Sequence, residues 1–130
     1  MRMKKPTVLL VDEDEIFRTV YARALEAAGY EIAHADGASA ALAQLDALEI
    51  DAVVSEVLLP GKNGLKLLKD IRVRTQSNAK PIILLTVLEA ADIGLYQSLQ
   101  QTLGVRAYLV KQKSTPDELI AAVNYSLTTS

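Results

Sequence analysis

The length and composition of the chain are those of one domain with its own hydrophobic core. It has 130 residues, half of them hydrophobic, and no cysteine, which excludes a fold held together by disulfides. The net charge of −2 excludes a global field that would draw the chain to nucleic acid or to a membrane surface. From this charge we expect no direct contact with nucleic acid. No apolar run approaches the length of a bilayer span, so we also expect no membrane segment.

The first residues do not form a signal peptide, because the apolar run that follows Lys4 and Lys5 is broken at once by four acids, Asp12 to Glu15. The absence of cysteine fits a reducing cytoplasm, where we place the chain. With no linker, repeat or low-complexity tract, residues 1–130 are interpreted as a single domain. The sequence ends soon after the last predicted helix, as a domain cut from a longer protein would.

Five short apolar segments are predicted as strands, and they alternate with five segments of helical periodicity. Unbroken apolar runs favour strands that are buried on both faces, whereas Glu31 and His34 place the second strand nearer an edge. We interpret His34 as structural, since one histidine makes neither a metal site nor a catalytic dyad. The predicted strands are Thr7–Val11, Glu31–Ala35, Ala52–Val54, Pro81–Thr86 and Ala107–Val110.

The helices are predicted from apolar residues spaced three or four apart and from their cap residues. Asp14 caps the first helix and Gly29 ends it, and Asn63-Gly64 marks a turn and a helix start rather than a hairpin. Thr115 to Glu118 combine a capping box with proline at the first helical position. The predicted helices span residues 16–28, 38–48, 65–74, 90–103 and those after Thr115, with apolar faces made by Ile16, Phe17, Val20, Tyr21, Ala24, Leu25, Ala41, Leu42, Leu45, Leu48, Leu67, Leu68, Ile71, Leu119, Ile120, Val123 and Leu127.

This alternation predicts an α/β fold with a doubly wound parallel sheet, right-handed crossovers and helices on both faces. Sites in such folds lie beyond the carboxyl ends of the strands. The carboxylates there suit Mg²⁺, whereas a hydroxyl and an amine suit phosphate oxygens. The polar side chains at these strand ends are Asp12, Glu13, Glu56, Thr86 and Lys111.

Four motifs, in this order, resemble the receiver domain of bacterial two-component response regulators over nearly the full length of the chain. They read VLLVDEDE, DAVVSEVLLPGKNG, PIILLT and AYLVK. The resemblance implies a flavodoxin-like (βα)5 fold with strand order 2-1-3-4-5 and a non-enzymatic role in phosphorelay signal transduction. It also implies a partner-binding face made by helix four, strand five and helix five, where a sensor kinase, an output protein or a second copy of the chain would dock.

The same resemblance assigns roles to individual residues. It implies a Mg²⁺ site made by Asp12, Glu13, the side chain at position 56 and the backbone carbonyl of Leu58. It implies a phosphoryl-binding and switch set made by Thr86, Tyr108 and Lys111.

The decisive departure from the family is at position 56, where the phosphorylated aspartate is replaced by Glu56. Glutamate is longer by one methylene, about 1.5 Å. Misplacing a nucleophile by about 1 Å can cost on the order of a hundredfold in rate, and the longer arm fills the space of the phosphoryl group. We therefore predict that Glu56 does not accept phosphate efficiently, and that Mg²⁺ binds weakly or not at all.

The acids of the crevice raise an electrostatic question. Asp12, Glu13 and Glu56 would be like charges in close quarters, so at least one should titrate high unless a cation compensates. Lys111 and Mg²⁺ are the two candidate cations. A direct pair between Glu56 and Lys111 fits an activated state as well as an inactive one, and the sequence does not decide between them.

Two further departures concern the end of the chain. Gln112 replaces the cis proline that usually follows the lysine, and a cis bond there would cost about 3 kcal/mol, so we expect a trans bond and a rearranged loop from Lys111 to Ser114. The segment from Thr86 to Lys111 is a few residues longer than usual, and helix four or its loops must absorb the difference. The residues of helix four expected to be exposed are polar but uncharged: Gln97, Ser98, Gln100, Gln101 and Thr102.

Two alternative functions stay open at this point. The chain could still work by phosphotransfer, through Glu56 or through Ser55, although Ser55 should point to the other side of the strand. It could also be a small phosphatase of the haloacid-dehalogenase type, because Asp12-Glu13-Asp14 after an apolar strand matches the opening motif of those enzymes. Against the second alternative, the chain lacks a late acidic pair and has no room for the usual cap domain.

Overall fold

A central sheet of five parallel strands organises the computed structural model, which describes residues 4–59, 62–75, 80–88 and 93–128. The strands lie in the order β2-β1-β3-β6-β7, so the five predicted strands have the order 2-1-3-4-5. The flavodoxin-like α/β fold is confirmed, and β2 lies at an edge as expected. The strand bounds are β1 (Thr7–Val11), β2 (Glu31–Ala35), β3 (Ala52–Ser55), β6 (Ile82–Thr86) and β7 (Val105–Val110).

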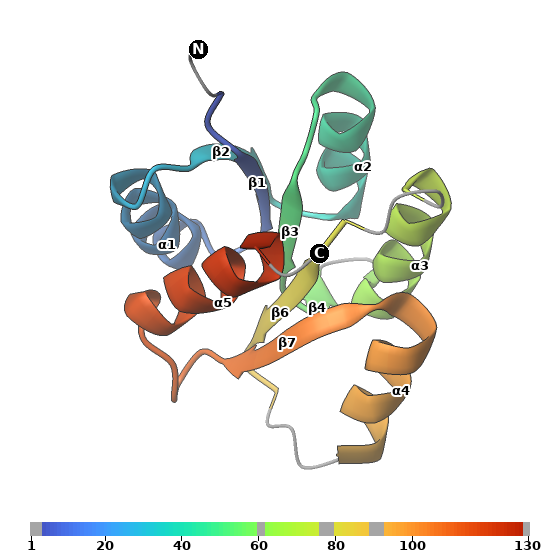
Figure 1. Ribbon diagram of the computed structural model, residues 1–130. Coiled ribbons are helices and arrows are strands. Elements are labelled where there is room, and N and C mark those ends of the chain that lie inside the picture. Colours follow the sequence, from blue (N-terminus) through green and yellow to red (C-terminus); the bar gives the residue numbers. More distant parts are fainter. Residues whose placement is uncertain (1–3, 60–61, 76–79, 89–92, 129–130) are drawn as a thin grey trace.

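Helices cover both faces of the sheet (Figure 1). On one face, α1 (Glu15–Ala27) and α5 (Pro116–Thr128) pack side by side. On the other lie α2 (Ala38–Ala47), α3 (Gly64–Arg74) and α4 (Ile93–Leu103). The strand residues alternate between two hydrophobic clusters, with Leu9 and Val53 in one and Val8 and Val54 in the other, because successive side chains of a strand point to opposite faces.

The predicted helix boundaries hold where a cap residue marks them. The Asp14 side chain accepts hydrogen bonds from the backbone N–H of Ile16 and of Phe17, and Gly29 follows the helix with a positive φ of 103°. The hydroxyl of Thr115 accepts from the N–H of Glu118 at 3.2 Å, and the Glu118 carboxylate accepts from the N–H of Thr115 at 3.3 Å. This reciprocal pair is the predicted capping box.

A short antiparallel ladder between β4 (Leu58–Leu59) and β5 (Lys62–Asn63) was not predicted, and Asn63 ends β5 instead of lying in a turn. Asn63-Gly64 does not connect the two paired strands, so the prediction that this pair is not a hairpin turn is not contradicted. The helix start at Gly64 is confirmed. Glycine is required there, because a Cβ at this position would overlap the carbonyl of Val57, whose oxygen accepts from the Gly64 N–H at 3.1 Å.

Two predicted inward faces were partly wrong. On α1, Tyr21 and Leu25 are buried against the sheet, but Ile16 is 78% exposed and Val20 is 50% exposed. The predicted face of this helix was too wide, since only the stripe with Tyr21 and Leu25 meets the sheet. On α2, Leu48 lies just past the helix and is 47% exposed, whereas the inward residues of α3 and α5 are confirmed in the two cores.

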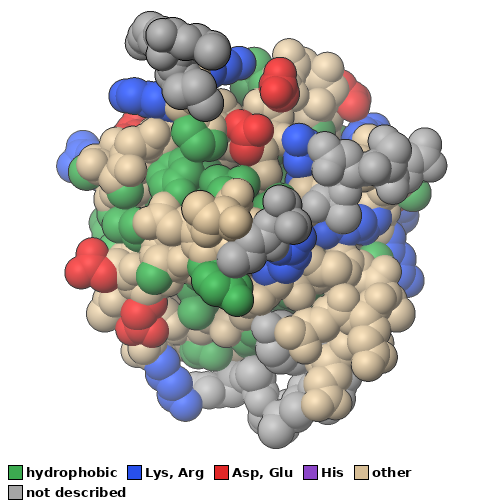
Figure 2. Space-filling model, viewed as in Figure 1, with side chains coloured by type: hydrophobic (Ala, Val, Ile, Leu, Met, Phe, Trp, Pro, Cys, Tyr) green, Lys and Arg blue, Asp and Glu red, His purple; other side chains and the backbone are tan. Residues whose placement is uncertain are grey.

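The surface of α4 has the predicted character. Its five polar residues are all exposed, and the lower right of Figure 2, where α4 lies, shows mainly the tan of uncharged polar side chains and backbone, with basic side chains beside it. The structure begins this helix at Ile93, and the predicted start at residue 90 lies outside the described residues. Part of the extra length expected between Thr86 and Lys111 also falls there. The exposed polar residues are Gln97, Ser98, Gln100, Gln101 and Thr102.

Candidate functional site

Four of the predicted site residues meet at one edge of the sheet, beyond the carboxyl ends of β1, β3, β6 and β7. These side chains are all buried, and they are Asp12, Glu56, Thr86 and Lys111. The parallel topology brings them together, because neighbouring strands end at the same edge. Glu13 is exposed beside this crevice and does not join the cluster.

The carboxylate of Glu56 is surrounded by hydrogen-bond donors. Its Oε1 atom accepts from the N–H of Val57 at 2.7 Å, from the N–H of Leu58 at 3.1 Å and from the hydroxyl of Thr86. Its Oε2 atom accepts from the N–H of Val87 at 3.1 Å. Both oxygens of this buried group are therefore satisfied by the protein, which fixes the carboxylate in one position.

Lys111 is the cation of the crevice. Its Nζ atom lies 2.5 Å from Oδ2 of Asp12 and 3.2 Å from Oε2 of Glu56, so the direct pair with Glu56 that the sequence allowed is present. The ammonium also lies 4.7 Å from the centroid of the Phe17 ring, within the range of a cation–π contact. Burial lowers the pKa of Lys111, but its hydrogen bonds to the two carboxylates and their charges outweigh burial and raise the pKa above its ordinary value.

Asp12 is held on two sides. Its Oδ1 atom accepts from the N–H of Asp14 at 2.9 Å, while Oδ2 faces Lys111. Its backbone carbonyl accepts from Nη1 of Arg18 at 2.5 Å, and its N–H donates to the carbonyl of Ala35 at 3.0 Å. The loop after β1 thus fixes the Asp12 carboxylate toward the lysine.

A chain of hydrogen bonds leads from the crevice to the surface between β7 and the loop after β6. Thr86 donates its hydroxyl proton to Glu56 and accepts from the N–H of Leu88 at 3.1 Å. The phenol of the half-buried Tyr108 donates to the carbonyl of Leu88 at 3.0 Å. Thr86 and Tyr108, which the family resemblance pairs as a switch, are therefore connected through one backbone residue, Leu88.

The comparisons with known proteins identify the family of the chain. The sequence profile of the response regulator receiver domain matches residues 8–124. The chain belongs to the response regulator receiver domain family. It thereby belongs to the signalling domains of two-component phosphorelays, a class that is generally not enzymatic.

The relatives are regulators of several kinds. The chain is 32% identical over 114 residues to the sensory/regulatory protein RpfC of Xanthomonas campestris, covering 85% of the chain and 15% of that protein. It is 33% identical over 115 residues to the phosphate regulon transcriptional regulatory protein PhoB of Pseudomonas aeruginosa, covering 88% of the chain and 48% of PhoB. The chain thus spans half or less of the length of these two relatives.

Among solved structures, the chemotaxis response regulator CheY4 of Vibrio cholerae superimposes with a TM-score of 0.82 at 27% sequence identity. The match covers 95% of this chain and 100% of that one. The overall fold of the receiver domain is therefore retained here, and the departures lie in individual side chains.

Receiver domains typically bind Mg²⁺ at the acidic phosphorylation site, but the donor set of this receiver fits the ion poorly. Mg²⁺ needs open oxygen ligands in octahedral geometry. Here the buried oxygens of Asp12 and Glu56 already accept from N–H groups, a hydroxyl and an ammonium, and Glu13 points into solvent. Within the described residues, no group of three or more acidic or histidine side chains is arranged to hold a metal.

The structure bears on the two alternative functions. Ser55 is fully buried and donates its hydroxyl proton to the carbonyl of Glu56 at 2.9 Å, so it is not presented as a nucleophile. Asp12, the nucleophile that a phosphatase of the haloacid-dehalogenase type would need, is paired with Lys111 and the Asp14 amide. The contacts of Ser55 argue against phosphotransfer through the serine, and membership of the receiver family argues against a phosphatase.

Some contacts of the site could not be found by sequence reasoning. The amides of Val57, Leu58 and Val87 become donors through the backbone path, which carries no residue-type signal. Phe17 was predicted as part of the apolar face of α1, and its position over Lys111 was missed. The expected trans bond at Gln112 is confirmed, as no described peptide bond is cis, and its side chain donates to the carbonyl of Val87 at 3.3 Å.

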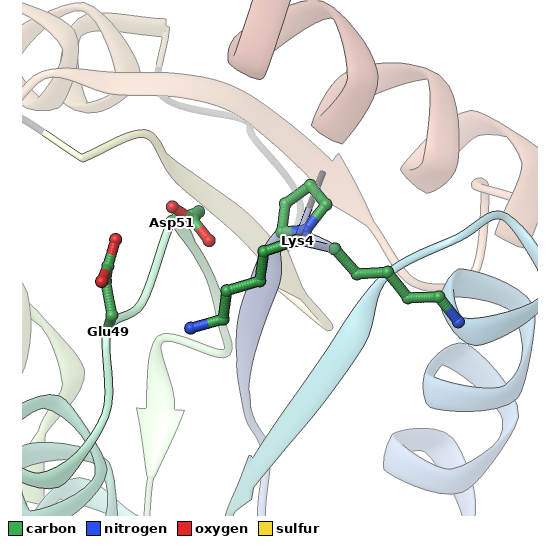
Figure 3. A pocket seen from close by; sticks show the side chains of 5 residues that line it. Lys4, Glu49 and Asp51 are labelled. Carbon is green, nitrogen blue, oxygen red and sulfur yellow. The ribbon is translucent and has the colours of Figure 1, made fainter. Parts of the chain in front are cut away.

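A hollow lies at the opposite edge of the sheet, where β1 and β3 begin. Figure 3 shows Lys4, Glu49 and Asp51 around it. Asp51 already accepts from the N–H of Thr7 at 2.8 Å, and the lining mixes both signs of charge. This hollow adds no recognisable chemistry to the crevice.

None of the helices in the described ranges is long and apolar enough to cross a bilayer.

Proposed function

We propose that this receiver domain signals without accepting a phosphoryl group, and that it acts by binding a protein partner. In this proposal the Glu56 carboxylate occupies the position that the phosphoryl group of an ordinary receiver would take, so that Thr86 and Lys111 are permanently engaged. The domain would then transmit a constitutive state, or respond to control other than phosphorylation.

The observation that carries the proposal is the set of donors around Glu56. The hydroxyl of Thr86 and the ammonium of Lys111 are the groups that the family resemblance assigns to the phosphoryl oxygens, and both contact this carboxylate. The extra methylene of glutamate extends the carboxylate by about 1.5 Å toward them. The backbone N–H of Val87 completes the set.

The contacts of Thr86 and Lys111 with Glu56 support the interpretation that the Glu56–Lys111 pair holds the domain in an activated state and not in an inactive one. Because Thr86 is drawn to Glu56 and also accepts from the N–H of Leu88, the loop after β6 is held close to the crevice. Tyr108 then meets the carbonyl of Leu88, which orients its ring along this loop. We infer that the switch residues stay in one position.

The partner would dock on the face made by α4, β7 and α5, which receiver domains use for kinases and output domains. The uncharged surface of α4 supports a partner recognised through hydrogen bonds and apolar contact rather than through opposite charge. Sensor kinases, output proteins and a second copy of the chain are the candidate partners, and we place the domain in the cytoplasm with them.

The proposal is tested by incubating the protein with acetyl phosphate and Mg²⁺ and measuring its intact mass. We expect no phosphoryl adduct on the wild-type chain. Stoichiometric phosphorylation that is lost in Glu56→Ala would overturn the proposal. An adduct that survives Glu56→Ala and is lost in Ser55→Ala would instead establish phosphotransfer through the serine.

A further inference from the structure

We propose that the ammonium of Lys111 is the permanent cation of the crevice, that Phe17 holds it there, and that the domain therefore does not bind Mg²⁺ at millimolar concentrations. The inference rests on the proposed function in one respect, namely that Glu56 stays engaged with Lys111. It goes further in assigning Phe17 a positioning role and in explaining why a divalent ion is kept out.

The first step is the position of the ammonium between the two buried carboxylates. Nζ of Lys111 lies 2.5 Å from Asp12 and 3.2 Å from Glu56, and the exposed fractions of these three side chains are 4%, 7% and 4%. The amine is therefore shielded from water and shared between the acids that a metal would need. A divalent ion could reach Oδ2 of Asp12 and Oε2 of Glu56 only by displacing the ammonium that contacts both atoms.

The second step is the state of the remaining oxygens. Oδ1 of Asp12 accepts from the Asp14 amide, and the oxygens of Glu56 accept from three backbone amides and from Thr86. Amides of the backbone cannot turn away without moving the chain. A Mg²⁺ ion, which dehydrates reluctantly and demands open oxygen ligands, would have to break bonds at Glu56, whose two oxygens meet four hydrogen-bond donors and the Lys111 ammonium.

The third step is the ring that covers the ammonium. Phe17 lies with its centroid 4.7 Å from Nζ of Lys111, inside the roughly 6 Å range in which a ring face attracts a cation. The ring is itself fixed, because it stacks on the buried Tyr21 with centroids 5.8 Å apart. It presents carbon where a hydrated metal ion would need oxygen, so it favours the lysine over the ion.

The test compares metal binding and thermal stability in four proteins: the wild type, Lys111→Met, Phe17→Leu and the control Lys69→Met, which changes an exposed lysine on α3. Binding is followed by the broadening of backbone amide NMR signals with Mn²⁺. Stability is followed by the unfolding temperature with and without millimolar MgCl₂. No phosphate donor is present, so the outcome does not depend on whether Glu56 can be phosphorylated.

We expect the wild type and Lys69→Met to show neither selective broadening near Asp12 and Glu56 nor a shift in unfolding temperature. Lys111→Met should unfold at a lower temperature, recover part of the loss with MgCl₂ and show selective broadening near the two acids. Phe17→Leu should show weaker broadening of the same amides, because its lysine is less firmly held.

Selective broadening in the wild type, or a rise in its unfolding temperature with MgCl₂, would overturn the proposal. A folded Lys111→Met that binds no metal would also overturn it, because the lysine would then not be what keeps the ion out. If Lys111→Met does not fold, the proposal is tested by the wild type and Phe17→Leu alone. The absence of any broadening in Phe17→Leu would then contradict the positioning role of the ring.

Discussion

The Oε1 atom of Glu56 accepts the hydroxyl proton of Thr86 across the gap between β3 and β6, while Oε2 meets Lys111 at 3.2 Å. One carboxylate thus joins three of the strands that end at the crevice. The family resemblance assigns Thr86 to the phosphoryl group, and the hydroxyl of this threonine is already bonded to Glu56.

Shortening the acid should restore the missing chemistry. In Glu56→Asp the carboxylate withdraws by about 1.5 Å, which opens the space between it and Thr86. We expect phosphorylation by acetyl phosphate and Mg²⁺ on the order of a hundredfold faster than in the wild type, because the nucleophile regains the geometry of the family. Intact-mass measurements over time check this, with Glu49→Asp, at an acid outside the crevice, as the matched control. Equal rates in Glu56→Asp and the wild type would contradict the geometric argument.

Removing the buried cation should be costly. Lys111→Met leaves Asp12 and Glu56 as uncompensated buried charges, and breaking such a pair costs about 3–5 kcal/mol of the free energy of unfolding. Urea denaturation at neutral pH and low magnesium measures the loss. The same change at Lys66, whose ion pair with Asp70 is exposed, should cost less than about 1 kcal/mol. Similar losses in the two variants would mean that Lys111 stabilises little.

The contribution of Lys111 should depend on pH with a definite sign. Its folded-state pKa is raised, so its stabilisation is fully present below the ordinary lysine pKa of about 10.4 and is lost as the pH rises through the folded value. The difference in unfolding free energy between the wild type and Lys111→Met should stay constant from neutral pH to about pH 10, and shrink above it. A difference that falls already between neutral pH and pH 9 would contradict this assignment.

The Tyr108 phenol should report on the loop after β6. Tyr108→Phe removes the bond to the Leu88 carbonyl, and we expect a loss of about 1 kcal/mol or less, since the ring is only half-buried. The amide signals of Val87 and Leu88 should shift in NMR spectra, while those around Asp12 stay in place. Tyr125→Phe, on the exposed surface of α5, should leave the Val87 and Leu88 signals unchanged. Unshifted Leu88 signals in Tyr108→Phe would argue against the hydrogen-bond chain.

The glycine at the start of α3 should tolerate no side chain. A Cβ at Gly64 would overlap the carbonyl of Val57, next to the site, so Gly64→Ala should lose about 1–3 kcal/mol of stability. Gly37 has open space around it, and Gly37→Ala should cost about 1 kcal/mol or less through its cap position. Thermal unfolding of the two variants checks the contrast, and equal costs would contradict the steric account.

The sequence was enough to place the crevice but not to describe its bonding. Glu56, Thr86 and Lys111 could be located, because apolar runs set the strands and parallel strands end at one edge. The amides of Val57 and Val87 could not, because the direction of a backbone N–H depends on the path of the loop. Ile16 was placed inward for a similar reason, since helical spacing alone does not say how wide a stripe the sheet will cover.

The central claim is that Glu56 leaves no place for a phosphoryl group, and ¹⁹F NMR with beryllofluoride, a phosphoryl mimic, tests it most directly. With Glu56→Asp as the positive control, we predict that the wild type in beryllofluoride and Mg²⁺ shows only the signals of free fluoride species. Protein-bound fluorine signals in the wild type, lost in Glu56→Ala, would contradict the claim.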